Sequence, residues 1–200
     1  MATTAKNVNT SERILDVAEE LVQVRGFNAF SYADVAGELG ITKAALHYHY
    51  PGKAELGQAL VSRYAERFAA ALVQIEARED ASAAEKLDAY VGLYTEVLRA
   101  RRMCLCGMLA AEYQTLPAPI KEAVVGFFDV NELWLARVLE QGRTDKSLRF
   151  EGSATDTARM IVSSMEGAML VARPYSDPAR FRAAATTLLA ALARPSARSQ

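Results

Sequence analysis

The sequence has few of the residues on which catalytic and metal sites depend. It contains two cysteines and two histidines, and residues 54–200 hold no histidine. The same region carries neither the Gly-x-Ser-x-Gly motif of hydrolases nor a glycine-rich phosphate loop. An enzyme built there would have to use carboxylates or cysteines alone. We therefore expect no catalysis, no cofactor and no metal site, and keep a cysteine-dependent helical-bundle enzyme as a remote alternative.

Long apolar runs are also missing. No stretch of 18 apolar residues occurs, so we expect no transmembrane helix and no membrane partner. The first ten residues lack the apolar core of a signal peptide, and we expect a cytoplasmic protein in which Cys104 and Cys106 are reduced. The 23 Lys and Arg residues are balanced by 24 Asp and Glu residues. This balance argues against a broadly basic surface for nucleic acid, but it allows a small local site.

Strand-like alternation is almost absent, and helical periodicity runs through nearly the whole chain. Glycine and proline punctuate the pattern, with Gly26 and Gly40 expected to end helices and Pro51-Gly52 to break the chain. We predict an all-α fold of about nine helices, with domains at 1–52 and 53–200 and with disorder at 1–9 and 195–200. The expected helices span about 10–25, 31–39, 42–48, 53–75, 82–101, 104–115, 117–142, 153–174 and 177–194.

Residues 32–50 have the spacing of a helix-turn-helix. Ala36 and Gly40 stand four apart, where a small residue allows two helices to approach and glycine allows the sharp turn between them. The second helix of such a pair enters the major groove with its first residues at the base edges. These residues are Thr42, Lys43, Ala44 and Ala45. Lysine can read guanine acceptors, and the methyl groups of alanine and threonine can contact thymine.

Local charge is compatible with this interpretation. From residue 41 to residue 53 there are two lysines, two histidines and no acidic residue. Lys53 is expected to begin a helix, where its amine and the unpaired backbone N–H groups could hold a phosphate. The alternative is that residues 10–50 form an ordinary three-helix core, since an Ala-x-x-x-Gly spacing alone also occurs by chance.

The segment from Gly26 to Leu56 resembles the helix-turn-helix of the TetR family of repressors. The family pattern appears as Gly26-Phe27, Ser31, Asp34-Val35-Ala36, Leu39-Gly40-Ile41, His47-Tyr48-His49-Tyr50 and Lys53-x-x-Leu56. His47 replaces a tyrosine that normally holds a phosphate. The resemblance implies base contacts from Thr42, Lys43, Ala44 and Ala45, and phosphate contacts from Ser31, Tyr48, His49 and Lys53. His47 could also donate to a phosphate in place of the tyrosine, and we include it among the expected DNA contacts. It also implies a three-helix DNA-binding domain joined by a long helix to a C-terminal bundle that senses ligands and dimerises.

The C-terminal region is rich in aromatic and methionine side chains. Most of them are expected in the core, yet a helical bundle with adaptable methionines can also enclose an apolar cavity. We expect operator DNA to be released when a small apolar effector binds. The residues expected to line its pocket are Tyr64, Phe68, Tyr94, Cys104, Met108 and Phe127.

The last two expected helices carry small and apolar residues along one face. By resemblance, this pair forms a four-helix interface in a homodimer, and the residues expected there are Ile161, Met165, Ala168 and Leu188. A palindromic operator favours this interpretation because its two half-sites require two helix-turn-helix units, one from each subunit. The alternative is that these faces pack only within their own subunit.

Residues 103–112 resemble a TetR subgroup with the pattern Gly-Cys-Leu-x-x-x-Leu-x-x-Glu at the start of the sixth helix. Cys104 fills the cysteine position, Met103 replaces the glycine, and Cys106 is additional. Some members of this subgroup sense electrophiles or oxidants through the cysteine, and a basic residue such as Arg173 would lower its pKa. A thiol switch at Cys104 is therefore an alternative mode of sensing. The simpler interpretation is that both cysteines are small buried hydrophobic residues.

Overall fold

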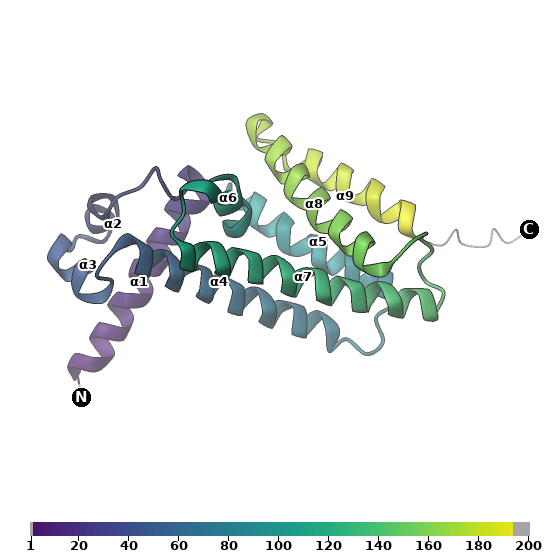
Figure 1. The fold of residues 1–200 in the computed structure, drawn as a ribbon, viewed down its shortest axis with the longest axis horizontal. Helices are drawn as coiled ribbons and strands as arrows, with labels where there is room; N and C mark the ends of the chain where they lie inside the picture. Colours follow the sequence, from purple (N-terminus) through teal and green to yellow (C-terminus); the bar gives the residue numbers. More distant parts are fainter. Residues whose placement is uncertain (1, 194–200) are drawn as a thin grey trace, which may run out of the picture. The chain divides into compact units, whose positions relative to one another are not determined.

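The computed structural model describes residues 2–193, with side chains from residue 10 onward. The described residues form nine α-helices and two short 3-10 helices, without a strand (Figure 1). The all-α fold of about nine helices is thereby confirmed. The elements are α1 (Ala2–Arg25), α2 (Tyr32–Leu39), α3 (Lys43–His49), α4 (Lys53–Glu76), α5 (Ala83–Arg99), α6 (Leu105–Ala111), η1 (Tyr113–Thr115), α7 (Ala118–Thr144), α8 (Ala154–Ala172), η2 (Arg173–Tyr175) and α9 (Pro178–Leu192).

Local chemistry sets most of the helix ends. Gly26 and Gly40, with φ angles of 95° and 66°, follow α1 and α2 in the left-handed region that favours glycine. At the start of α5, the Ser82 side chain accepts a hydrogen bond from Glu85 N–H, while Glu85 accepts one from Ser82 N–H. This reciprocal capping satisfies two backbone groups that have no partner inside the helix. Such signals are short-range, which is why the sequence pattern locates these ends.

Two segments differ from the expectation. Helix α1 begins at Ala2, although disorder was expected through residue 9; residues 195–200, also expected to be disordered, lie outside the described residues. The predicted helix over 104–115 is divided, because α6 ends at Ala111 and a 3-10 turn follows. Glu112, between the two, has φ −103° and ψ 10°, and its carboxylate bonds to a distant turn. A long-range contact thus replaces the last helical turn.

The chain forms two compact units, which are described separately. The first contains the described residues up to Arg67 together with Arg102–Phe127, and the second contains Phe68–Arg101 together with the described residues from Phe128 onward. Helices α4 and α7 each contribute their first part to the first unit and their last part to the second. The functional boundary expected between residues 52 and 53 stays a prediction.

The core of the first unit forms around α1. Its residues Ile14, Ala18 and Val22 are fully buried, and so are Val35 of α2 and Leu46 of α3. Arg63 of α4 stabilises the packing of α4 on α1. Its guanidinium donates hydrogen bonds to the α1 side chains of Glu12, Asp16 and Glu19, the last at 3.0 Å. The helix-turn-helix is therefore part of a larger unit that includes the start of α4, α6 and the start of α7.

The second unit is a helical bundle in which α8 and α9 lie side by side and both contact α5 (Figure 1). Its centre is aromatic, with Tyr90, Tyr94 and Phe181 almost completely buried. None of the described helices is long and apolar enough to cross a membrane.

Candidate DNA-binding site

The first turn of α3 is held in place by its buried side and exposed on the other. Leu46 is fully buried and anchors the helix. At the opposite side Thr42, Lys43 and Ala44 are exposed, and Ala45 is half-buried. The Thr42 hydroxyl oxygen accepts a hydrogen bond from Ala45 N–H at 3.1 Å, which caps the helix. All four residues predicted to face base edges thus lie together at the N-terminal turn of α3.

Two tyrosines that were not predicted as site residues brace this helix. The Tyr32 hydroxyl donates to Tyr50 O at 2.9 Å, and the Tyr50 hydroxyl is 2.8 Å from Ser11 Oγ. Burial raises the pKa of Tyr32 to about 12, with the charges of Glu55 and Tyr50 acting in the same direction. Tyr32 therefore stays a hydrogen-bond donor at physiological pH, and it ties α2 to the residue that ends α3. In the sequence Tyr32 shares a helical face with Val35 and Leu39, and nothing in that spacing indicates the hydrogen bond of its hydroxyl.

Four of the predicted DNA contacts line one surface depression of about 420 Å³. They are Ser31, Lys43, His47 and Lys53, and the remaining lining residues are Phe30, Tyr32 and Ala33. Three of the four can carry positive charge, so the depression suits an anion. Tyr48 and His49 do not line it; the Tyr48 side chain is 75% exposed, and its ring contacts His49 at 5.3 Å between centroids.

Lys53 is less available than its sequence position suggests. Its ammonium donates to Phe30 O at 2.5 Å and lies 4.8 and 4.4 Å from the centroids of the Phe27 and Phe30 rings. Burial holds the pKa of Lys53 below its usual value, and the negative charge of Glu112 opposes this effect. The ammonium therefore stabilises the loop between α1 and α2, in addition to any contact it makes with a phosphate.

Ser31 and His47 are also engaged within the protein. Asp34 accepts hydrogen bonds from Ser31 N–H at 2.7 Å and from the Ser31 hydroxyl at 2.6 Å. These bonds hold the pKa of Asp34 below its ordinary value, and Arg25 contributes a smaller effect in the same direction. His47 Nδ1 lies 3.0 Å from Pro51 O, and its ring contacts the Tyr32 ring at 4.6 Å between centroids, with the two planes tilted by 48°. A carbonyl oxygen only accepts, so Nδ1 must carry the proton there.

The cysteines lie in the first unit. Cys104 is the N-cap of α6 and is 1% exposed, and Cys106 is fully buried. The Tyr64 hydroxyl donates to Cys104 Sγ at 3.7 Å, and the Tyr64 and Phe127 rings are 5.6 Å apart. Met108, also expected at the effector pocket, lies on α6 in the same unit, whereas Arg173 belongs to the second.

The other expected pocket residues, Phe68 and Tyr94, belong to the aromatic cluster of the second unit. Their rings are 6.0 Å apart, and Tyr94 stacks on Phe181. The Tyr90 hydroxyl donates to Asn131 Oδ1 at 3.2 Å, and the Tyr90 ring stacks on Trp134 at 5.7 Å. Trp134 Nε1 is buried and has no hydrogen-bond partner among the described residues. The aromatic composition of this region points to the cluster but does not reveal which polar atom is unsatisfied.

The expected dimer interface needs a correction at two positions. Ile161 and Met165 have no exposed surface, because the side of α8 that carries them packs inside the second unit. They therefore stabilise the subunit itself. Ala168 and Leu188 are half-buried, and Leu170 and Val171 of α8 are 58% and 60% exposed. The exposed apolar surface of α8 is thus displaced around the helix from the predicted one.

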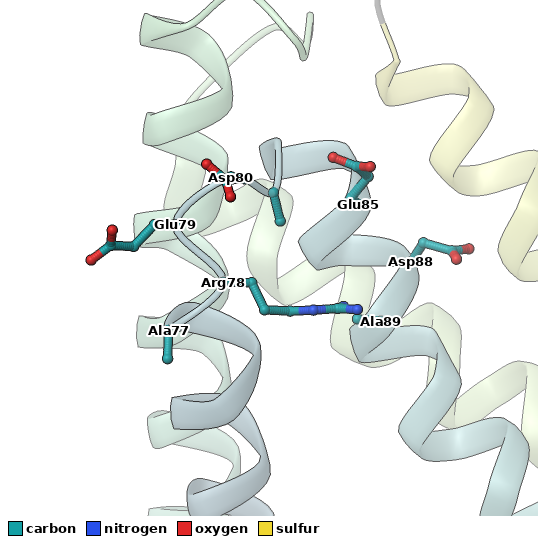
Figure 2. Close-up of a pocket in the computed structure, with 8 residues that line it drawn as sticks. Ala77, Arg78, Glu79, Asp80, Glu85, Asp88 and Ala89 are labelled. Carbon is teal, nitrogen blue, oxygen red and sulfur yellow. The ribbon is translucent and has the colours of Figure 1, made fainter.

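A depression of about 740 Å³ lies at the turn between α4 and α5. Its lining is mainly charged, with Arg78, Glu79, Asp80, Glu85 and Asp88. Figure 2 shows these acidic side chains pointing in different directions, away from a common centre. No group of three potential metal ligands occurs in the described part of the chain. This depression therefore has the features of a solvated turn.

Comparison with known proteins agrees with the architecture. The family model described as "Bacterial regulatory proteins, tetR family" matches residues 14–60, and "Tetracyclin repressor-like, C-terminal domain" matches residues 83–188. No curated protein sequence matches the chain.

Solved structures resemble most of the chain. A TetR-family transcriptional regulator from Agrobacterium tumefaciens is 32% identical, with a TM-score of 0.90 over 94% of this chain and 100% of that chain. A TetR transcriptional regulator from Legionella pneumophila is 36% identical, with a TM-score of 0.81 over 92% and 97%. The reduced form of Escherichia coli NemR shares the fold, with 21% identity and a TM-score of 0.80 over 94% and 100%. The chain therefore belongs to the TetR family of DNA-binding transcriptional regulators.

Proposed function

We propose that the protein is a homodimeric repressor that binds a palindromic operator through α3 and leaves it when a small molecule binds. The exposed first turn of α3 carries this proposal, together with the adjacent depression lined by Ser31, Lys43, His47 and Lys53. In this arrangement Lys43 faces base edges, while Ser31, His47 and Lys53 contact phosphates. Tyr48 and His49, at the end of α3, contact the backbone beside them.

The test uses a DNA duplex selected by the wild-type protein from a random pool. Lys43→Ala should weaken binding to this duplex and reduce the preference over random DNA, by about 1–3 kcal/mol if Lys43 reads a guanine. Lys146→Ala removes the same charge from an exposed turn between α7 and α8 and serves as the control. Equal binding of selected and random DNA by the wild type, or an unchanged preference in Lys43→Ala, would contradict the proposed reading edge.

The aromatic cluster of the second unit fits a small, mainly apolar effector with one hydrogen-bond acceptor. Phe68, Tyr90, Tyr94 and Phe181 offer aromatic surface, and Trp134 Nε1 is an unsatisfied donor among them. A buried donor without a partner costs about 1–3 kcal/mol, which an acceptor on the effector would recover. Tyr64, Cys104, Met108 and Phe127 belong to the first unit and stay sequence-based predictions of effector contacts.

Trp134 is the only tryptophan of the chain, so its fluorescence reports directly on this cluster. Apolar compounds with and without a carbonyl group should be titrated while fluorescence and DNA release are followed together. Trp134→Phe keeps an aromatic ring and removes the N–H donor. We expect it to weaken the binding of the carbonyl compounds and to leave the binding of the others unchanged. Ligands that release DNA without changing the fluorescence would place the effector elsewhere.

A thiol switch at Cys104 is a second candidate. The hydrogen bond from Tyr64 to Cys104 Sγ supports it, whereas the 1% exposure of Cys104 opposes rapid reaction. Alkylation of the wild type, Cys104→Ser and Cys106→Ser should be followed by mass spectrometry beside DNA binding. The switch requires that Cys104 is modified when DNA is released and that Cys104→Ser is resistant.

A further inference from the structure

The C-terminal end of α6 carries a carboxylate that accepts hydrogen bonds from the turn between α1 and α2, just before the helix-turn-helix. Glu112 caps α6; its Oε2 accepts a hydrogen bond from Phe27 N–H at 2.5 Å, and its Oε1 accepts one from Asn28 N–H at 3.2 Å. Beside it, Asn28 Nδ2 donates to Thr115 Oγ1 at 2.7 Å. Three hydrogen bonds therefore join the segment 112–115 to the turn between α1 and α2.

The turn is shaped to receive this carboxylate. Gly26 has a φ angle of 95°, and a Cβ atom at this position would lie 3.0 Å from Glu112 Oε1. The next two N–H groups bond to the two oxygens of one carboxylate, as in the backbone nests that bind anions. Glycine thus gives the turn both its conformation and the space that Glu112 occupies.

Phe27 is held from a second side by Lys53. The Lys53 ammonium lies over the rings of Phe27 and Phe30 and donates to Phe30 O, which fixes the loop that leads into α2. Helix α4 also approaches closely, since a Cβ atom on Gly57 would lie 2.8 Å from Phe27 Cε2. The position of α2 therefore depends on a turn fixed by α6 through Glu112 and by α4 through Lys53. Helix α3 follows α2 after the short Gly40–Thr42 turn.

We propose that Glu112 is a positioning residue for DNA binding, because its carboxylate holds the α1–α2 turn. A signal that moves α6 withdraws this carboxylate from the turn and thereby displaces α2 and α3. This inference rests on the proposed function as a DNA-binding repressor. Helix α6 has seven residues between Cys104 and Glu112. A displacement at its buried N-terminal end is therefore transmitted over two helical turns to the carboxylate.

The test replaces Glu112 by glutamine. The side chain keeps its shape, but one of its two acceptor oxygens becomes an NH₂ group that cannot accept from a backbone N–H. We expect Glu112→Gln to bind the selected duplex at least tenfold more weakly, which corresponds to about 1.4 kcal/mol. We also expect faster hydrogen exchange at the Phe27 and Asn28 amides, with an unchanged unfolding midpoint from Trp134 fluorescence. Glu122→Gln, an exposed position on α7 in the same unit, is the matched control.

Wild-type DNA affinity in Glu112→Gln, with amides as protected as before, would overturn the inference. If this variant fails to fold, Glu112→Asp keeps the charge but is one methylene shorter, and it should show the same two changes to a smaller extent. A wild-type protein that selects no duplex would instead refute the proposed function. A wild type that binds, a Lys43→Ala variant that does not discriminate and an unaffected Glu112→Gln would together refute only the role of Glu112.

Discussion

At position 47 the chain carries histidine where the family pattern has tyrosine, and the structure gives this difference a chemical consequence. His47 Nδ1 is engaged with Pro51 O, so the neutral ring presents Nε2 as an acceptor. A phosphate also only accepts. The neutral ring thus has no further N–H for a phosphate, so the contact of His47 should be weaker than that of a tyrosine hydroxyl.

We expect His47→Tyr to bind the selected duplex more tightly than the wild type, because a tyrosine hydroxyl can donate to a phosphate whereas Nδ1 of His47 is engaged with Pro51 O. His47→Phe keeps a ring at this position but has no donor, and it should bind no more tightly than the wild type. Fluorescence anisotropy with the selected duplex measures all three affinities. His49→Tyr adds the same hydroxyl outside the depression and is the control, which should change the affinity less. Equal affinities of His47→Tyr and His47→Phe would exclude position 47 as a phosphate contact.

At the scale of the helix, three elements begin with the same device. Helices α2, α5 and α8 follow Ser31, Ser82 and Ser153, and the residue three positions later is acidic in each case. Hydrogen bonds from the serine hold the pKa values of Asp34, Glu85 and Asp156 below their ordinary values of 3.8, 4.5 and 3.8. A carboxyl group with a lowered pKa stabilises the folded state above its ordinary pKa, and this contribution is lost as the pH falls through the folded value.

The free energy of unfolding should therefore decrease as the pH falls from about 5 towards 3, and the three caps should account for part of the decrease. Glu85→Gln should reduce the slope of the urea midpoint against pH in this interval and change the midpoint at pH 7 only slightly, since the side chain is exposed. Ser82→Ala should remove the same part of the slope. Additive effects of the two changes would show that they do not act through one hydrogen bond.

The caps also explain what the sequence can predict about this fold. Periodicity, serine caps and glycine ends are local, and they place most of the described helices close to their observed bounds; the early start of α1 and the division of 104–115 are the exceptions. The division of the segment 104–115 depends on Glu112 reaching a turn far away in the chain, and no local pattern contains that contact. The ammonium of Lys53 was expected at DNA, but the rings that hold it become neighbours only after folding. Ile161 and Met165 are apolar in either interpretation, and only packing decides that they are internal.

For the molecule as a whole, the proposed reading of one half-site by one α3 helix means that a palindromic operator requires a second copy of the chain. The surface proposed for this association consists of the exposed and half-exposed apolar residues of α8 and α9, including Ala168, Leu170, Val171 and Leu188. Small residues at the surface of α9 permit close helix packing. Ile161 is internal and Leu188 is partly exposed. Substitutions at these two positions therefore distinguish an effect on the stability of the subunit from an effect on dimer formation.

We expect the wild type to sediment as a dimer at micromolar concentration and Leu188→Glu to sediment as a folded monomer, because a charge in a closely packed interface would be buried without a partner. This monomer should keep its helical circular dichroism and bind the selected duplex much more weakly, since only one reading head engages. Ile161→Ala, by contrast, should lower the free energy of unfolding by about 2–5 kcal/mol through the cavity it leaves, and the protein should stay dimeric as long as it is folded. A wild type that sediments as a monomer would refute the homodimer. A Leu188→Glu variant that stays dimeric would show that the subunits associate through another surface, and the exposed side chains of Leu170 and Val171 would then be tested in the same way.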